Sequence, residues 1–173
     1  MFLIRPIAAT DVKEVVAFSL RAWAPVFASF ETVLGPAIYE RLYPDWLTSH
    51  GQAVERICTG DAYTVWVAEH SGRPVGFAAV ALHDGDGLET ASGQIEMLAV
   101  DPDHQRQGIA DALIAFALDQ MRMAGVRLAV VGTGGDPATL QPGGPMRRLA
   151  SRPCPSSAIT MPSDAADPSS ALG

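Results

Sequence analysis

The chain has little cysteine, and neither cysteine belongs to a recognisable site. Cys58 and Cys154 are the only two in 173 residues, and they show no metal-ligand spacing. No histidine-linked motif accompanies Cys58, so a small buried residue is a better interpretation than a nucleophile. His50, His70, His83 and His104 are interpreted as surface histidines rather than a metal set. These features favour a reduced protein with no metal site.

Long apolar runs and excess positive charge are also missing. No apolar stretch approaches the roughly 20 residues that span a bilayer, and Arg5, Pro6 and Asp11 stand where a signal peptide has its apolar centre. Twelve Lys and Arg against 19 Asp and Glu give a net charge of −7 and a pI near 4.9. The expectation is a cytoplasmic protein whose main partner is neither nucleic acid nor membrane.

Apolar residues, by contrast, are plentiful. They make up 48% of the chain, and 173 residues give room for one domain with a substantial core. The patterns predict a strand at 2–7, a helix from Asp11 with a break at 30–36, and a helical region at 37–58 bent near Pro44 and Gly51. Further strands are predicted at 62–69, 75–82, 94–100 and 126–131, with a helix at 111–125 before the last.

Residues 105–110, with the sequence Gln-Arg-Gln-Gly-Ile-Ala, are the most informative segment. An apolar strand precedes them and a helix with one apolar stripe follows. The first N–H groups of a helix lack internal partners and carry partial positive charge, so they attract anions. Gly108 and Ala110 let a phosphate approach the backbone closely. The segment therefore predicts a site for a phosphate-bearing ligand.

Other interpretations of this loop are less favoured. A Walker-type loop needs a lysine, and a dinucleotide loop needs G-x-G-x-x-G, of which only Gly108 and Ala110 fit the spacing. An ordinary strand-to-helix connection with a glycine turn remains the alternative. The second glycine cluster, residues 132–135, is followed by Pro137 and by no convincing helix.

The pattern Q-x-x-G-x-A resembles the pyrophosphate loop of GNAT-type N-acetyltransferases, which is Q/R-x-x-G-x-G/A in that family. Residues 98–102 look like the strand ending of the family, and residues 3–11 look like its first strand and the start of its first helix. The resemblance covers residues 1–138. It implies an α/β GNAT fold, with a mixed, mostly antiparallel central sheet flanked by helices and an irregular C-terminal tail.

The resemblance also implies acetyl-CoA as co-substrate and an amine-bearing acceptor. In the family, the pantetheine arm pairs with the exposed edge of the strand before the loop, and a backbone N–H, here near Leu98, holds the oxyanion. The cofactor-binding residues implied by position are Leu98, Ala99, Val100, Gln105, Arg106, Gln107, Gly108, Ile109 and Ala110. A homodimer is left open.

Glu96 is the candidate general base, acting through water, because an acceptor amine with a pKa of about 10.4 must lose a proton before it attacks. The alternative is a solvated strand carboxylate. The family often supplies a tyrosine as general acid, but no tyrosine follows Tyr63 in this chain. A CoA-binding or regulatory module without turnover is therefore the second function class. Trp23, Phe27 and Phe30 are interpreted as core rather than as an acceptor pocket.

The last part of the chain departs from the family. Residues 137–173 contain seven Pro, six Ser and three Gly but no aromatic residue and no Val, a composition that cannot bury a core. Residues 1–138 are assigned to a GNAT domain lacking its usual closing helix and strand, and 139–173 to a disordered tail. Back-translated from Ala138 and read one nucleotide earlier, the segment resembles the last helix and turn of the family and gains a tyrosine.

We therefore predict a reading-frame shift near Ala138. Sequencing the gene tests this directly, because an unshifted frame through codon 173 would contradict it. Protease digestion offers a second test, since a disordered tail is cleaved before residues 1–135. A tail that resists cleavage as well as the rest of the chain would count against the shift.

Overall fold

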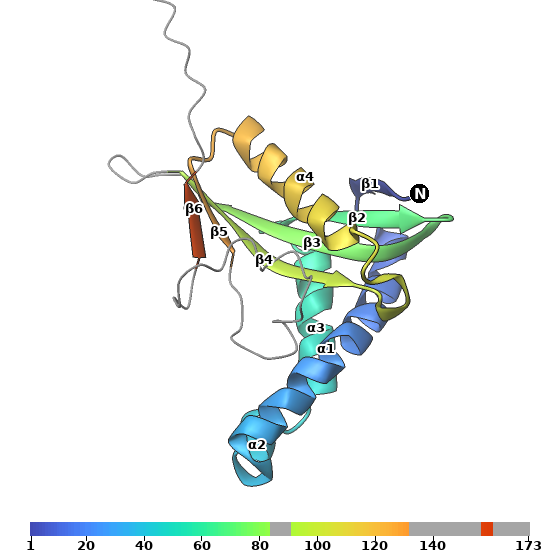
Figure 1. Cartoon of the computed structure of the whole chain (residues 1–173), viewed down its shortest axis with the longest axis vertical. Coiled ribbons are helices and arrows are strands. Elements are labelled where there is room, and N and C mark those ends of the chain that lie inside the picture. Colours follow the sequence, from blue (N-terminus) through green and yellow to red (C-terminus); the bar gives the residue numbers. More distant parts are fainter. Residues whose placement is uncertain (84–90, 132–156, 161–173) are drawn as a thin grey trace, which may run out of the picture.

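The computed structural model describes residues 1–83, 91–131 and 157–160 of the chain (Figure 1). Strand β1 (Leu3–Pro6) comes first in the chain, and three helices separate it from the other strands of the sheet. The helices are α1 (Val12–Leu34), α2 (Pro36–Leu42), α3 (Trp46–Thr59) and, later in the chain, α4 (Ile109–Met123). The other strands are β2 (Thr64–His70), β3 (Arg73–His83), β4 (Ser92–Val100), β5 (Leu128–Val131) and β6 (Ser157–Thr160).

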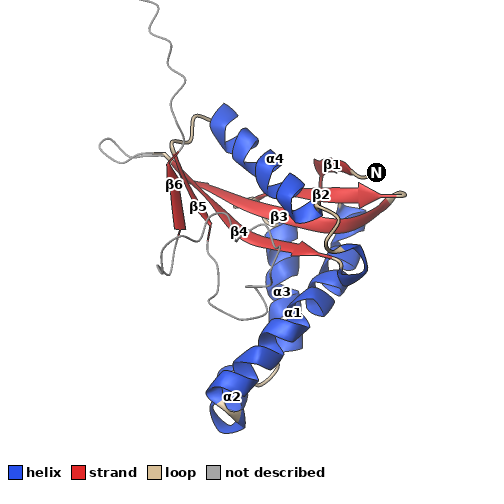
Figure 2. Ribbon diagram, in the orientation of Figure 1, coloured by secondary structure: helices blue, strands red, loops and turns tan. Residues whose placement is uncertain are grey.

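The strands form one mixed sheet in the order β1-β2-β3-β4-β5-β6. Neighbouring strands are antiparallel except β4 and β5, which run parallel. Helix α4 covers one face of the sheet, and α1 and α3 cover the other (Figure 2). The α/β fold with a mixed, mostly antiparallel sheet flanked by helices is confirmed. None of the described helices is long and apolar enough to cross a membrane.

Alternating side chains on the central strands supply a core on each face of the sheet. Trp66 and Val80 face α4, while Val67 and Phe77 face α1 and α3, where the Phe77 ring lies 6.2 Å from that of Phe18. Burying a side chain of this size contributes about 1.5–3 kcal/mol, so the sheet and its helices stabilise each other.

Two glycines let α4 lie close to the sheet. A Cβ on Gly76 would lie 3.0 Å from Cγ2 of Ile109, at the start of α4. A Cβ on Gly93 would lie 2.9 Å from the sulfur of Met121, near the end of the helix. The absence of side chains at these two glycines therefore lets both ends of α4 pack directly on the strands.

The first helix is longer than expected. The break predicted at 30–36 begins too early, because α1 continues to Leu34. The helix stops at Gly35, which has a φ of 76°. The expected interruption near Pro44 is confirmed, but the bend at Gly51 is absent. Gly51 lies inside α3 where the helix faces α1, and a Cβ there would lie 3.6 Å from Cγ1 of Val16, an ordinary contact distance.

An aromatic cluster joins the three N-terminal helices. Phe27 is buried and stacks on Trp46 at 4.2 Å, and the rings of Phe30 and Tyr43 stack at 5.8 Å. These contacts are those of a helical core, as the core interpretation of the aromatic stripe expected.

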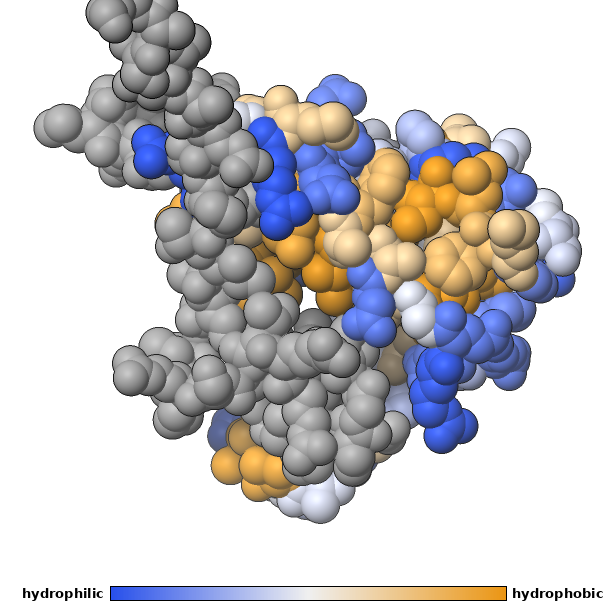
Figure 3. Space-filling model, turned by 45° about the horizontal axis from the view of Figure 1, so that its top comes forward, coloured by the Kyte–Doolittle hydropathy of each residue, from blue (hydrophilic) through white to orange (hydrophobic). Residues whose placement is uncertain are grey.

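The helical end of the molecule also has exposed apolar side chains. Val33, Ile38, Leu42 and Leu47 are all more than half exposed. In the space-filling view, hydrophobic surface appears at the lower end, where α2 lies in Figure 1 (Figure 3). The aromatic cluster therefore lies between the sheet and an apolar tip.

The histidine expected at a surface break lies inside this cluster instead. His50 is within α3, with its ring 5.0 Å from Trp23 and 5.6 Å from Phe27. Its Nε2 is buried and has no hydrogen-bond partner. The surface interpretation of His50 is wrong because α3 does not break at Gly51.

Of the segment assigned to a tail, residues 139–156 and 161–173 lie outside the described residues. Residues 157–160 pair with β5 as β6. The disorder of the tail and the proposed frame shift stay predictions.

Because His50 is half-buried, we expect the free energy of unfolding to depend on pH. Burial lowers the pKa of His50, whereas in the unfolded chain it takes up a proton near a pKa of about 6.5. Its contribution is therefore fully present above about pH 6.5 and is lost as the pH falls toward the lower folded pKa. We expect the melting temperature to fall between about pH 7.5 and pH 5.

A matched variant separates this effect from other titrations. His50→Phe keeps an aromatic ring among Trp23 and Phe27 but removes the titrating group, so its melting temperature should fall less over the same range. An equally steep fall in both proteins, followed by thermal unfolding, would show that His50 is not responsible.

Candidate functional site

Strand β4 contains a bulge at Glu96. Met97 pairs with Ala79 and Ile95 pairs with Val80, so Glu96 is left without a partner on β3. The extra residue reverses the alternation of side chains, and Ile95 packs on the α4 side while Met97 packs on the α1 and α3 side. Bulges re-aim side chains and bend strands, and this one lies at the residue expected to act as base.

The other edge of β4 is paired only over its first half. Strand β5 pairs with residues Ser92 to Ile95, and its last described pair is Val131 with Ile95. No strand in the part of the chain that the structure describes pairs with this edge from Glu96 to Val100. Backbone N–H and C=O groups on such an edge can pair with an extended ligand.

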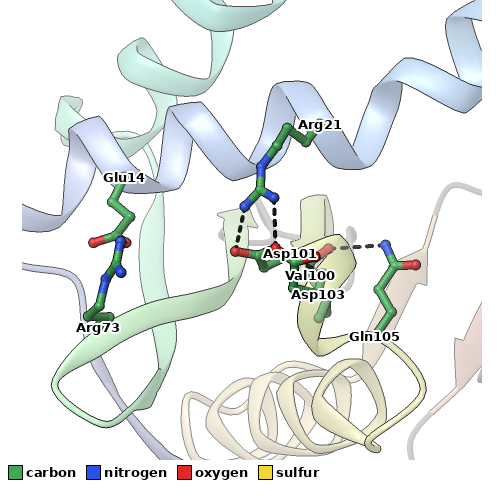
Figure 4. Close-up of polar contacts among 7 residues, drawn as sticks. All are labelled: Glu14, Arg21, Arg73, Val100, Asp101, Asp103 and Gln105. Atoms are coloured by element: carbon green, nitrogen blue, oxygen red, sulfur yellow. Dashed lines mark hydrogen bonds and ion pairs between the residues drawn. The ribbon is translucent and has the colours of Figure 1, made fainter.

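The chain leaves β4 through a turn that bonds back to the strand. The N–H of Asp101 donates to the carbonyl of Val75 at 2.8 Å, and Oδ1 of Asp101 accepts from the N–H of Asp103 at 3.0 Å. Nε2 of Gln105 then donates to the carbonyl of Val100 at 3.1 Å (Figure 4). The Gln105 side chain therefore shapes the loop by closing it onto the end of the strand.

Left-handed backbone conformations follow in the loop. Arg106 has a φ of 61° and Gly108 a φ of 78°, and α4 begins directly after Gly108 without a side-chain cap. Turns that contain left-handed residues can point backbone N–H groups toward one side, a geometry that binds anions. Helix α4 adds the positive end of its dipole at the same place.

The predicted site residues differ in what they present to solvent. Glu96 is exposed, and its Oε2 accepts a hydrogen bond from Nε2 of Gln94 at 2.9 Å. Residues 105–108 are exposed, whereas Ala110 is half-buried and Ile109 is buried against β3. Ile109 therefore anchors the helix and offers only its main chain.

The main chain of residues 98–100 lies on the same stretch of β4. The side chains of Leu98 and Val100 pack on the α4 side of the sheet, and that of Ala99 packs on the opposite side. The structure thus places Glu96, the open edge and the loop consecutively along one path.

Sequence reasoning missed one residue of this region. Arg21 on α1 forms ion pairs with Asp101 at 2.7 Å and with Asp103 at 2.9 Å, both in the turn before the loop (Figure 4). Arg21 is separated from its partners by 80 and 82 positions, and no local pattern marks it.

Neither Cys58 nor a cluster of metal-ligating side chains adds a candidate site in the described ranges. Burial raises the pKa of Cys58 to about 11, so its thiol stays protonated at neutral pH, as a structural cysteine does. No group of three or more metal-ligating side chains is found in residues 1–83, 91–131 and 157–160.

A family comparison interprets this arrangement. The model of the acetyltransferase (GNAT) family matches residues 34–139, which include the bulged strand, the loop and α4. The chain belongs to the GNAT family of acetyltransferases. A search of curated proteins found no match.

Solved structures of this family have a similar fold. A GNAT acetyltransferase from Brucella melitensis in complex with acetyl-CoA superposes with a TM-score of 0.63 at 22% identity, over 95% of this chain and 90% of that one. The ribosomal-protein-S18-alanine N-acetyltransferase from Escherichia coli gives 0.55 at 20% identity, over 80% and 71%. AAC(6')-Iy in complex with the bisubstrate analogue CoA-S-monomethyl-acetylneamine gives 0.54 at 21%, over 79% and 82%. At these identities the likeness establishes the shared GNAT fold.

The loop geometry predicts unequal effects of substitution. A Cβ on Gly108 would meet nothing within 4 Å, so Gly108→Val strains only the backbone, by about 1–2 kcal/mol, but occupies the space above the helix start. We expect acetyl-CoA binding to weaken at least tenfold in Gly108→Val and no more than about threefold in Arg106→Ala, because main-chain N–H groups hold the phosphates.

Isothermal titration with acetyl-CoA measures both variants. Equal losses would mean that the Arg106 charge carries the binding, and no loss at Gly108 would place the phosphates elsewhere.

Proposed function

We propose that this GNAT protein transfers the acetyl group of acetyl-CoA to an amine by direct attack. The observation that supports it most is the continuity of the open β4 edge with the left-handed loop and the uncapped start of α4. An extended pantetheine arm ending in a pyrophosphate has the shape and charge that such a path accepts.

The cofactor would lie along this path in one direction. The main chain of Leu98, Ala99 and Val100 would pair with the pantetheine amides, and residues 105–110 would hold the pyrophosphate. This places the thioester toward the bulge, where a backbone N–H near Leu98 would hold the oxyanion formed at the acetyl carbonyl.

Glu96 is suited to be the base because it is exposed at the bulge, where the thioester would lie. Its carboxylate is oriented by Gln94 and would take a proton from the acceptor ammonium through water. The neutral amine then attacks the acetyl carbon, the nitrogen of the tetrahedral intermediate gives its remaining extra proton to water as the C–S bond breaks, and CoA leaves as a thiolate. With no tyrosine beyond Tyr63, water is the proton source for that thiolate.

A second function is supported by the same missing tyrosine. A chain that binds CoA through its backbone but lacks a general acid would act as a CoA-binding or regulatory module. The named structures include a ribosomal-protein-S18-alanine N-acetyltransferase and AAC(6')-Iy bound to the bisubstrate analogue CoA-S-monomethyl-acetylneamine, so they indicate no single acceptor.

Titration with acetyl-CoA and CoA, paired with thiol release over a panel of amines, separates the two functions. Micromolar binding with thiol release on at least one amine is expected for the enzyme. Binding without release on peptide N-termini, lysine, polyamines and aminoglycosides would favour the module, and no binding would contradict both.

Glu96→Gln tests the base within the enzyme. We expect kcat to fall about 100-fold, the lower range for general-base catalysis, with acetyl-CoA binding unchanged. Glu55→Gln, at an exposed position on α3, is the control and should keep full activity. An unchanged kcat in Glu96→Gln would identify Glu96 as a solvated strand residue.

A further inference from the structure

Arg21 links one face of the sheet to the turn that precedes the loop. It lies on α1, and its two terminal nitrogens bond different carboxylates, Nη2 to Asp101 at 2.7 Å and Nη1 to Asp103 at 2.9 Å. Figure 4 shows the guanidinium of α1 pointing onto this turn. The forked guanidinium is suited to such a double contact, which the single ammonium of lysine cannot reproduce.

The bulge in β4 explains why this contact forms. After Glu96, the side chains of Met97 and Ala99 lie on the α1 and α3 side of the sheet. Asp101 is the next residue in that alternation and still bonds β3 through its N–H. Its side chain therefore faces α1 and meets Arg21.

Asp101 fixes the turn at four points. Its N–H bonds Val75 at 2.8 Å, its carbonyl accepts from the N–H of His104 at 2.8 Å, and its Oδ1 accepts from the N–H of Asp103 at 3.0 Å. The fourth is Oδ2, which accepts from Arg21. Of these bonds, the one from Arg21 ties the turn to a helix from the other face of the sheet.

The acidic side chains of the turn would repel the anionic ligand proposed for the loop. Asp101 and Asp103 place two carboxylates within a few residues of Gly108, in a chain with a net charge of −7. Both would repel a pyrophosphate, and Arg21 pairs with both. Such a repulsion is screened over about 8–10 Å at ordinary ionic strength, so its strength depends on salt.

We propose that Arg21 is a positioning residue for the cofactor, which holds the turn in register and neutralises it so that residues 105–110 can accept the pyrophosphate. This inference rests on the proposed function. Arg21 acts through Asp101 and Asp103 and not on the acetyl group. Its loss raises the KM for acetyl-CoA and leaves kcat and the KM of the amine near their original values.

Arg21→Ala and Arg21→Lys test the proposal, with Arg73→Ala as the control. Arg73, at the start of β3, pairs with Glu14 on α1, is exposed, and forms no hydrogen bond or ion pair with the turn in the described structure. We expect acetyl-CoA binding to weaken about three- to tenfold in Arg21→Ala, by less in Arg21→Lys, and not at all in Arg73→Ala. The loss should be greater at low salt. Titration, steady-state kinetics and thermal unfolding give the readouts.

The double variant Arg21→Ala with Asp103→Asn shows whether charge is part of the effect. Removing one carboxylate should restore part of the binding lost in Arg21→Ala. The proposal would be overturned if the double variant recovered no acetyl-CoA binding, or if Arg21→Ala bound acetyl-CoA within twofold of the original protein. It would also be overturned if Arg73→Ala lost as much binding, or if the KM of the amine rose as much as that of acetyl-CoA. If the original chain itself does not bind acetyl-CoA, the proposed function fails first, which distinguishes the two failures.

Discussion

The single extra residue at Glu96 is the constraint on which the site depends. Because the bulge reverses the alternation of β4, Leu98 and Val100 join the core under α4, and Ala99 faces α1 and α3. An unbulged strand would exchange these faces, so that Val100 would leave the α4 core and Asp101 would point away from Arg21. The same residue is thus the candidate base and the origin of the geometry that follows it.

The loop after β4 is held from two sides of the sheet. On one side, Gly76 lets Ile109 sit against β3, which fixes the first turn of α4. On the other, Arg21 holds the turn through Asp101 and Asp103. The N–H groups of the loop are therefore positioned by packing and charge rather than by contacts made within the loop alone.

The sequence was sufficient for features that depend on local pattern. Periodicity predicted β1 to β5 and α4 within a few residues, and the spacing of Gln105, Gly108 and Ala110 predicted the loop and the start of α4. It placed the end of α1 too early and did not predict β6. It did not indicate the bulge, because residues 95–97 alternate no differently from an unbulged strand. It did not indicate Arg21, whose partners lie 80 positions away, or the burial of His50, which depends on packing between α1 and α3. Features created by contacts between distant elements leave no local pattern.

The bond from the Gln105 side chain to Val100 has a consequence for the rate of association. Together with the left-handed Arg106 and Gly108, it fixes the turned shape of the loop through contacts made within the chain itself. The conformational entropy of that shape is lost during folding, not during binding. Encounter with an anion then needs no slow rearrangement of the loop, and association should proceed at a rate limited by diffusion and orientation, with affinity set mainly by how fast the anion departs.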